Sequence, residues 1–432
     1  MKSRRLTILT VAAVTALALA GCAPTGSGSN TATKPGGDGK LTIWSSFGGA
    51  QGDAIKAYSD SFAKTHPKAN VDLVVMSNDD LKQKVQAALV SKSLPDVIQY
   101  YGGSAMKPLV DAKALVPLDS YIKASKPWND NLVKNWADTY TFAGKTYGVP
   151  VESPTVQLFY NKALLSKAGI SSPPQTFDEL LNAVGALKKV GVIPISADGK
   201  DGWPMQEFFT YLVMRNGGAT ALSDAFAGKL AWDSDVFLKS AKQLKQLVDA
   251  GAFQQGYLGE GYDQLLAHYV NGEAGMTLTG SWFVGNLTAA KGDILKNTGF
   301  TSFPTVAGGK GLATEAQGGP NASFSVTTNA DSNSEAWDFV KGLTSKEVAT
   351  QVANAANVVV PNDITLSATA PAILSDLFAQ QAKITAFNLF WNEVFSAPQN
   401  TQYTDLQNSM LSGSITPEQM VTKFADYMKS QG

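Results

Sequence analysis

An alternation of short apolar segments with amphipathic helices opens the body of the chain and limits the folds it can adopt. Residues 41–44, 71–76 and 97–100 are rich in β-branched and aromatic side chains, which predicts strands. Residues 49–64 predict a helix between the first two strands. The order strand, helix, strand, helix, strand predicts a mostly parallel sheet with helices on both faces. We therefore expect an α/β fold.

Several helix starts can be read from the sequence. A helix is expected to begin at Asn78 or Asp79, because one apolar helix face follows at the i, i+4, i+7, i+8 spacing, formed by Leu81, Val85, Ala88 and Leu89. Patterns of the capping-box type predict further helices that begin at Thr176, Thr344 and Thr416. These patterns concern the fold and carry no chemistry.

Length and composition limit what the body of the chain can do. The chain has 432 residues, 44% of them hydrophobic, which allows a sizeable core and suggests two domains or lobes. His66 and His268 are the only histidines, so a transition-metal site would have to be built from carboxylates; we expect neither metal nor cofactor. Without residues 1–21, which hold three basic and no acidic residues, the formal net charge falls from −1 to −4. Such a balance does not indicate nucleic-acid binding.

The first 22 residues predict export from the cytoplasm. A basic start with Lys2, Arg4 and Arg5 precedes the apolar run 6–19, the layout of a secretory signal peptide. That run is too short to span a bilayer comfortably. The sequence Leu-Ala-Gly-Cys that ends at Cys22 resembles the lipobox of bacterial lipoproteins. This resemblance implies cleavage of a signal peptide of residues 1–21 and a lipid on Cys22.

Cys22 is the only cysteine, so no disulfide can form within the chain. A buried core thiol or an unpaired secreted thiol are the alternatives to lipid attachment. The position at the signal-peptide boundary favours the lipid, since residues 23–39 are rich in Gly, Ser, Thr and Pro and contain little to bury. We expect residues 22–39 to form a lipidated flexible tether that holds an extracytoplasmic body near the cell membrane.

The carboxyl ends of the predicted parallel strands are the first place to look for a ligand site. The residues there are Ser45, Ser46 and Phe47 after the first strand, Asp79 and Asp80 after the second, and Tyr100 and Tyr101 at the end of the third. Ordinary turns and caps are the alternative for these loops, and either aspartate could cap a helix. Alternation along the strand lets one of the two tyrosines face the core and the other the ligand.

Ordered motifs along residues 40–432 resemble extracellular solute-binding proteins of the family 1 type, the maltose-binding-protein-like receptors of ABC importers. The segments that carry the resemblance are residues 40–44, 94–98, 147–150, 158–162, 173–180, 271–276, 280–282 and 303–304. The resemblance implies a type II periplasmic-binding fold, in which a hinge joins two lobes, each a mostly parallel sheet flanked by helices. Lobe 1 is expected at 39–149 plus about 304–358, and lobe 2 at 150–303 plus about 359–432. The resemblance also implies a non-catalytic, monomeric receptor that captures an oligosaccharide by hinge closure and delivers it to a permease.

Aromatic and polar residues in this pattern suit a sugar, because aromatic rings stack on its C–H faces and amides or carboxylates bind its hydroxyls. The resemblance points to Trp282 and Trp391 as stacking positions; packing between the lobes or within a helix is the alternative. It also suggests a role in ligand binding for Asn392, which stands beside Trp391, and for residues in polar turns or beside the predicted lobe crossings: Glu152, Trp203, Gln206, Gly319 and Asn321.

Two other functions are compatible with such a sequence. A receptor of the same fold could bind a polyol or an amino acid. A secreted glycoside hydrolase would also use aromatics and a pair of carboxylates. The sequence contains no G-x-S-x-G, H-E-x-x-H or P-loop motif, so we expect a binding protein and not an enzyme.

Overall fold

The computed structural model describes residues 40–67, 69–290, 292–330 and 332–431. The described residues belong to one compact unit. The predicted signal peptide, Cys22 and the tether of residues 22–39 lie outside the described residues. None of the described helices is long and apolar enough to cross a membrane.

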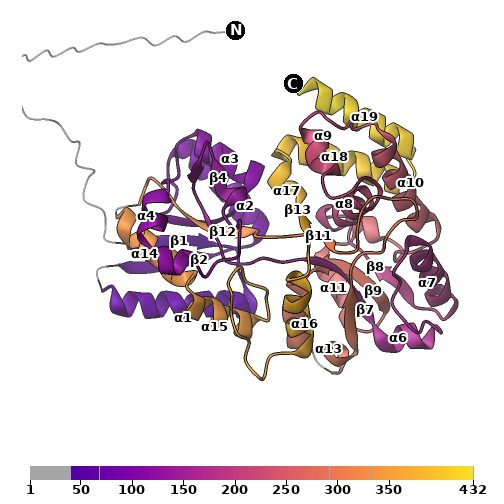
Figure 1. The fold of residues 1–432 in the computed structure, drawn as a ribbon, viewed down its shortest axis with the longest axis horizontal. Helices are drawn as coiled ribbons and strands as arrows, with labels where there is room; N and C mark the ends of the chain where they lie inside the picture. The colour runs from indigo at the N-terminus through magenta and orange to yellow at the C-terminus, as the bar shows by residue number, and fades with distance from the viewer. Residues whose placement is uncertain (1–39, 68, 291, 331, 432) are drawn as a thin grey trace, which may run out of the picture. The chain divides into compact units, whose positions relative to one another are not determined.

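The first of two large sheets has the strand order β2-β1-β3-β12-β6. Its first three strands, β1 (Lys40–Ser45), β2 (Asn70–Val75) and β3 (Val97–Tyr101), are parallel, which confirms the predicted alternation. The strand β12 (Ala322–Val326) runs antiparallel to β3 and to β6 (Val149–Pro150). The helices that accompany the first sheet are α1 (Gly49–Thr65), α2 (Asn78–Ser91), α3 (Gly103–Asp111), α4 (Asp119–Ala124), α5 (Lys126–Asn129), α14 (Asn333–Leu343) and α15 (Lys346–Ala356). Two of them, α1 and α15, lie side by side in Figure 1.

The second sheet has the order β10-β7-β9-β8. Its strands are β7 (Val156–Asn161), β8 (Ile193–Ser196), β9 (Ala274–Gly280) and β10 (Thr298–Thr301). Only β8 and β9 pair in parallel; β7 is antiparallel to both of its neighbours, so the expectation of a mostly parallel sheet is wrong for this lobe. The reason is that β7 follows directly from β6 of the first sheet and pairs antiparallel with the distant strand β9. The periodicity of the helices between them does not indicate this strand direction. Its helices include α6 (Lys162–Lys167), α7 (Phe177–Lys189), α8 (Trp203–Gly217), α9 (Ala221–Phe226), α10 (Asp235–Asp249), α11 (Tyr262–Val270), α12 (Phe283–Ala289), α13 (Ile294–Asn297), α18 (Ala397–Leu411) and α19 (Pro417–Ser430).

Smaller elements complete the fold. A two-stranded sheet joins β11 (Glu315–Gln317) to β13 (Ala386–Asn388), and a hairpin joins β4 (Thr141–Phe142) to β5 (Lys145–Thr146). Two short helices, α16 (Ala372–Gln381) and α17 (Trp391–Val394), flank β13 in the chain, and η1 (Asp138–Tyr140) and η2 (Tyr257–Gly259) are single 3-10 turns.

Each sheet has its own apolar core. Ile43, Val97 and Phe324 belong to the core of the first sheet. In the second sheet, alternation along β9 sends Leu278 into the larger core, which also contains Phe208 of α8. A smaller core on the other face of this sheet contains residues such as Phe159 and Tyr269. Separate cores around the two sheets are what a two-lobed molecule requires.

The helix starts follow the sequence with one exception. Thr176 and Thr416 cap α7 and α19 in complete capping boxes, as predicted. Thr344 does not cap α15; it ends α14, where its hydroxyl donates to the carbonyl of Val340 (2.8 Å), and Ser345 caps the next helix. Ser77 caps the helix that was expected to begin at Asn78 or Asp79.

Three connections lead from one sheet region to the other and are hydrogen-bonded together: residues 151–155, 302–321 and 357–371. The amide of Ser153 donates to the carbonyl of Val359 (2.9 Å), and that of Gly319 to Pro154 (2.9 Å). Gly318 has a φ of 143° and lies so close that a Cβ there would meet the Pro154 oxygen at 2.2 Å. These connections lie near the predicted lobe boundaries at 149–150, 303–304 and about 358, which themselves stay a prediction.

Arg215 of α8 holds the longest of these connections in place. Its side chain is fully buried, and its guanidinium donates to the carbonyls of Phe303 (2.9 and 3.1 Å), Leu312 (2.6 Å) and Glu315 (3.1 Å). A buried cation needs such partners, because an unpaired one is strongly unfavourable. Arg215 is therefore a structural residue of the connection.

Candidate binding site

Three half-buried aromatic side chains meet where α8, α11 and α12 begin. Trp203 and Tyr262 are the first residues of α8 and α11, and Trp282 directly precedes α12. The ring centroid of Trp203 lies 5.0 Å from that of Tyr262 and 5.9 Å from that of Trp282. We name these three residues the aromatic cluster. It unites two of the predicted site residues, Trp203 and Trp282, with Tyr262, which the sequence did not single out.

Local sequence fixes the orientation of the Trp282 indole. Its Nε1 donates to the hydroxyl of Tyr262 (2.8 Å), which also lies 3.1 Å from Oγ1 of Thr279. Gly280 ends β9, and a Cβ there would lie 2.1 Å from the indole ring. Glycine is thus required for the indole to pack on the strand. A ring held from two sides is preorganised for stacking, which lowers the entropy cost of binding.

Two buried carboxyl groups lie beside the aromatic cluster. Glu207 follows Trp203 by one helical turn on α8, and Asp198 follows β8. Among the described residues, neither carboxyl oxygen of Glu207 has a hydrogen-bond partner, and Oδ2 of Asp198 has none. Oδ1 of Asp198 accepts from the amide of Asp201 (3.0 Å). Buried polar atoms without partners are costly, so this position favours a polar occupant.

Burial determines the protonation of these acids. It raises the pKa of Glu207 well above the usual value, and the nearby Asp198 raises it further. Burial raises the pKa of Asp198 to about 7, with a smaller contribution from Asp201. The pKa of Tyr262 is also raised, first by burial and then by the charges of Glu207 and Asp198. Perturbed carboxyls beside aromatics mark a candidate site. The i, i+4 spacing from Trp203 is the one sequence signal that could have indicated Glu207.

A second polar group lies at the connections between the sheets, where two of the predicted site residues, Glu152 and Asn321, meet. Nδ2 of Asn321 donates to Oε1 of Glu152 (3.4 Å), and the two residues also share a backbone hydrogen bond (3.3 Å). Burial raises the pKa of Glu152 to about 7, against hydrogen bonds from Gln51, Ala322 and Asn321 that lower it. Among the described residues, Oδ1 of Asn321 has no partner. This pair can therefore bind hydroxyl groups only if the connections expose it.

An exposed aromatic residue that the sequence did not select lies at the same connections. Phe387 of β13 is 38% exposed, and its ring lies beside Gly319, where a Cβ would contact it at 3.7 Å. Gly319 is buried and has a φ of 113°. The segment that contains Trp391 thus presents Phe387, and not the tryptophan, at the surface.

The predicted residues of the first sheet divide into buried and accessible ones. Ser45 is buried and accepts from the amide of Phe47 (3.1 Å), and Tyr100 is buried. Ser46 bonds Oε1 of Gln99 through both its amide and its hydroxyl (2.7 Å each). Ser46, Phe47 and Tyr101 are half-buried, and the Tyr101 hydroxyl donates to Oδ1 of Asn78 (2.8 Å). The three half-buried residues remain candidates for ligand contact.

Three predicted site residues have structural roles instead. The carboxylate of Asp80 accepts from the hydroxyl of Ser77 (2.7 Å), and its amide donates back (3.1 Å), so Asp80 completes a helix cap. Gln206 is buried, and its Nε2 donates to Asn400 and Thr404 (2.9 Å each), which ties α8 to α18. Trp391 is 2% exposed and packs in the core of the second sheet. The side chains of Asp79 and Asn392 lie outside the described residues.

The buried carboxyl at Glu152 gives a testable dependence of stability on pH. Its pKa is 4.5 in the unfolded chain and about 7 in the folded one, so unfolding releases a proton between these values. The contribution to stability is fully present below pH 4.5 and is lost as the pH rises to about 7, a change of roughly 3 kcal/mol. We expect Glu152→Gln to remove this part of the slope.

Urea unfolding at pH 5, 6, 7 and 8 measures the effect. The variant should be more stable than the unsubstituted protein at pH 8 and have a flatter pH profile. Glu347→Gln, at an exposed position of α15, is the matched control and should keep the original slope. Equal slopes in the Glu152 variant and the unsubstituted protein would contradict the assignment.

Comparison with known proteins agrees with the two-lobed α/β fold. An ABC transporter extracellular-binding protein of Pyrococcus horikoshii is 25% identical over 294 residues, which is 65% of either chain and thus just under two thirds of that relative. A multiple sugar-binding protein of Streptococcus mutans is 26% identical over 296 residues, 67% of each chain. A solved structure from work on xylan utilization by Caldanaerobius polysaccharolyticus is 27% identical, with a TM-score of 0.85 over 90% of this chain and 99% of that one. The model of the bacterial extracellular solute-binding proteins matches residues 46–350, and the chain belongs to this family.

Proposed function

We propose that this protein is the substrate-binding subunit of an ABC importer that captures a neutral carbohydrate, an oligosaccharide, and delivers it to the membrane permease. The observation that carries the proposal is the aromatic cluster beside Asp198 and Glu207. Sugar rings present apolar C–H faces and a belt of hydroxyls, which suit stacked aromatics and unpaired carboxyl groups. The sugar-binding relative from Streptococcus mutans supports the same ligand class.

The charge around the cluster favours a neutral ligand. The pKa values of Asp198 and Glu207 are changed by burial, by hydrogen bonds and by neighbouring acids, and no cationic side chain contributes. A phosphate or a carboxylate would therefore meet two acidic groups without a compensating charge, which is unfavourable in a buried site. This argument favours neutral sugars over anionic solutes such as phosphate esters and simple carboxylates.

Capture requires that two lobes close on the ligand. We infer lobe 1 from residues 39–149 with about 304–358, and lobe 2 from 150–303 with about 359–432. The hydrogen-bonded connections between the two sheets are then the hinge. The ligand shifts the molecule toward the closed state because it binds that state more tightly. The protein holds and releases its ligand unchanged, and hydrolysis of ATP takes place on another subunit.

A calorimetric and tryptophan-fluorescence screen of the mature protein tests the proposal. Neutral mono- and oligosaccharides are compared with amino acids and polyols. We expect binding of at least one neutral oligosaccharide without any product after prolonged incubation. Binding of only an amino acid or a polyol would contradict the ligand class, and product formation would identify a hydrolase.

The position in the cell follows from the proposed lipid on Cys22. We expect Cys22→Ala to release the protein from the membrane fraction, because the acylated cysteine is the attachment point. Ligand affinity should stay unchanged, since the aromatic cluster consists of Trp203, Tyr262 and Trp282, which are far from Cys22 in sequence. Cell fractionation and calorimetry measure the two effects. Retention of the variant in the membrane would contradict the anchor.

A further inference from the structure

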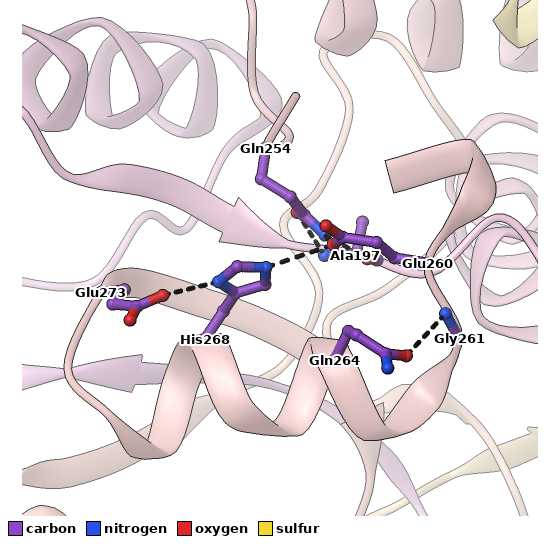
Figure 2. Close-up of polar contacts among 7 residues, drawn as sticks. All are labelled: Ala197, Gln254, Glu260, Gly261, Gln264, His268 and Glu273. Atoms are coloured by element: carbon purple, nitrogen blue, oxygen red, sulfur yellow. Dashed lines mark hydrogen bonds and ion pairs between the residues drawn. The ribbon is translucent and has the colours of Figure 1, made fainter. Parts of the chain in front are cut away.

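His268 lies between two carboxylates in the last turn of α11 (Figure 2). Its Nδ1 is 2.6 Å from Oε2 of Glu273, in the turn before β9, and its Nε2 is 3.1 Å from Oε2 of Glu260, in the segment before α11. Both ring nitrogens thus face acceptors. A neutral imidazole can donate from only one nitrogen, so this arrangement favours the doubly protonated cation.

The charged surroundings agree with this geometry. Partial burial lowers the pKa of His268, but the hydrogen bonds and charges of Glu273 and Glu260 outweigh it and raise the pKa above 6.5. Within the described part of the chain, these two carboxylates are the charged groups found at the ring. The helix dipole adds to the effect, because a cation is stabilised at a helix C-terminus.

Glu260 connects the histidine to the loop that precedes the aromatic cluster. The same Oε2 that faces His268 accepts from Nε2 of Gln254 (2.7 Å). Gln254 is buried, and its amide binds both backbone groups of Ala197: Oε1 accepts from the amide (3.0 Å) and Nε2 donates to the carbonyl (2.6 Å). Figure 2 shows this chain of contacts. Ala197 directly precedes Asp198 of the candidate site.

Further hydrogen bonds join the two segments that carry the aromatic cluster. The amide of Gly199 donates to the carbonyl of Tyr257 (2.9 Å), and that of Lys200 to Glu260 (3.2 Å). The amide of Tyr262 donates to Oδ2 of Asp201 (3.0 Å). Residues 197–202 lead to Trp203 and residues 254–262 end at Tyr262, so these contacts determine how the two rings lie relative to each other.

We infer that His268 is a positioning residue for the aromatic cluster: its cation holds Glu260, and Glu260 with Gln254 fixes residues 254–262 against residues 197–202. The inference rests on the proposed function in one respect: the proposed function makes the aromatic cluster the ligand site. Loss of the proton removes one of the two hydrogen bonds of the ring and leaves a lone pair facing a carboxylate. The contact is therefore present below the pKa of His268 and weakens as the pH rises through it.

The chain supplies its own control, because His66 is the only other histidine. His66 stacks on Phe62 at the end of α1, with ring centroids 3.9 Å apart. This helix accompanies the first sheet, whereas His268 and the aromatic cluster accompany the second. Proton NMR of the full protein should show two imidazole signals, assigned with His66→Gln. We expect the His268 signal to titrate above 6.5. Glu260→Gln should lower that pKa, because it removes one carboxylate.

Amide hydrogen exchange then measures the positioning itself, without any ligand. The amides of Ala197, Gly199, Lys200 and Tyr262 are followed at pH 6 and pH 9, as protection factors corrected for the intrinsic exchange rate. We expect His268→Gln to lower the protection at pH 6 by about tenfold, since a hydrogen bond to a charged group is lost. The unsubstituted protein should show the same loss at pH 9, and His66→Gln should match the unsubstituted protein at both values.

His268→Lys separates the charge from a merely structural role of the ring. Its permanent cation should retain protection at pH 9, where the histidine does not. Equal protection of the four amides in His268→Gln and the unsubstituted protein at both pH values would overturn the inference. Because exchange needs no sugar, that result is distinct from a failed sugar screen, which would overturn the proposed function and leave the exchange pattern intact.

Discussion

Trp391→Ala is expected to lower the free energy of unfolding by about 3–5 kcal/mol. The indole is 2% exposed, and its ring centroid lies 4.1 Å from that of Tyr403 and 4.5 Å from that of Phe395. Its Nε1 donates to Oγ1 of Thr210. Truncation therefore leaves a large cavity among aromatic rings and removes the hydrogen bond to Thr210, whose hydroxyl still donates to the carbonyl of Gln206 (2.9 Å). The cavity and the lost hydrogen bond both destabilise the core.

Urea unfolding of the variant measures this loss, and calorimetry on the remaining folded protein measures sugar affinity, which should be unchanged. Phe387→Ala is the matched control from the same segment. Because Phe387 is 38% exposed, its truncation should cost about 1 kcal/mol or less. A Trp391 variant with normal stability and no sugar binding would restore the role that the sequence first indicated, stacking on the ligand.

Trp282→Ala is expected to weaken oligosaccharide binding by about 10- to 100-fold, since a stacked indole loses its contact area with the sugar. The melting temperature should stay within about 5 °C, because the side chain is only half-buried. Trp203→Ala should have a similar effect on affinity. The two substitutions together should cost less than the sum of the single effects, because the rings contact each other at a centroid distance of 5.9 Å.

Tyr262→Phe gives the finer comparison. It keeps the ring but removes the hydroxyl that accepts from Nε1 of Trp282 (2.8 Å). A smaller loss of affinity than in Trp282→Ala would show that the hydroxyl orients the indole. Unchanged affinity after Trp282→Ala, together with a large loss of stability, would assign this tryptophan to lobe packing and remove the cluster from the binding site.

Much of the fold could be predicted from local pattern. The strands at 41–44, 71–76 and 97–100 and the capping boxes at Thr176 and Thr416 depend on side chains close together in sequence, and all are confirmed. Strand direction in the second sheet was wrong, because β7 pairs with β9 across more than 100 residues, and no local pattern records such a pairing.

The candidate site could be predicted less well, and the errors have a common cause. Trp203 was selected from a polar turn and Trp282 from the family resemblance at the end of a predicted strand; both lie at helix starts and are half-buried. Trp391 and Gln206 lie on buried helix faces, where the same residue types pack or bond internally. Asp198 and Glu207 were missed because their interest comes from burial without a partner, which the sequence does not show.

By itself the sequence determined the order of strands and helices, the family resemblance and the expectation of export with a lipid on Cys22. Each of these depends on residues that are close together in the sequence, so a local pattern is enough to predict it. Only the tertiary structure decided which tryptophans meet, which acids are buried without partners, and that His268 lies between Glu260 and Glu273. Burial and the pKa changes it causes depend on groups that folding brings together from distant positions, so they appear only in the folded chain.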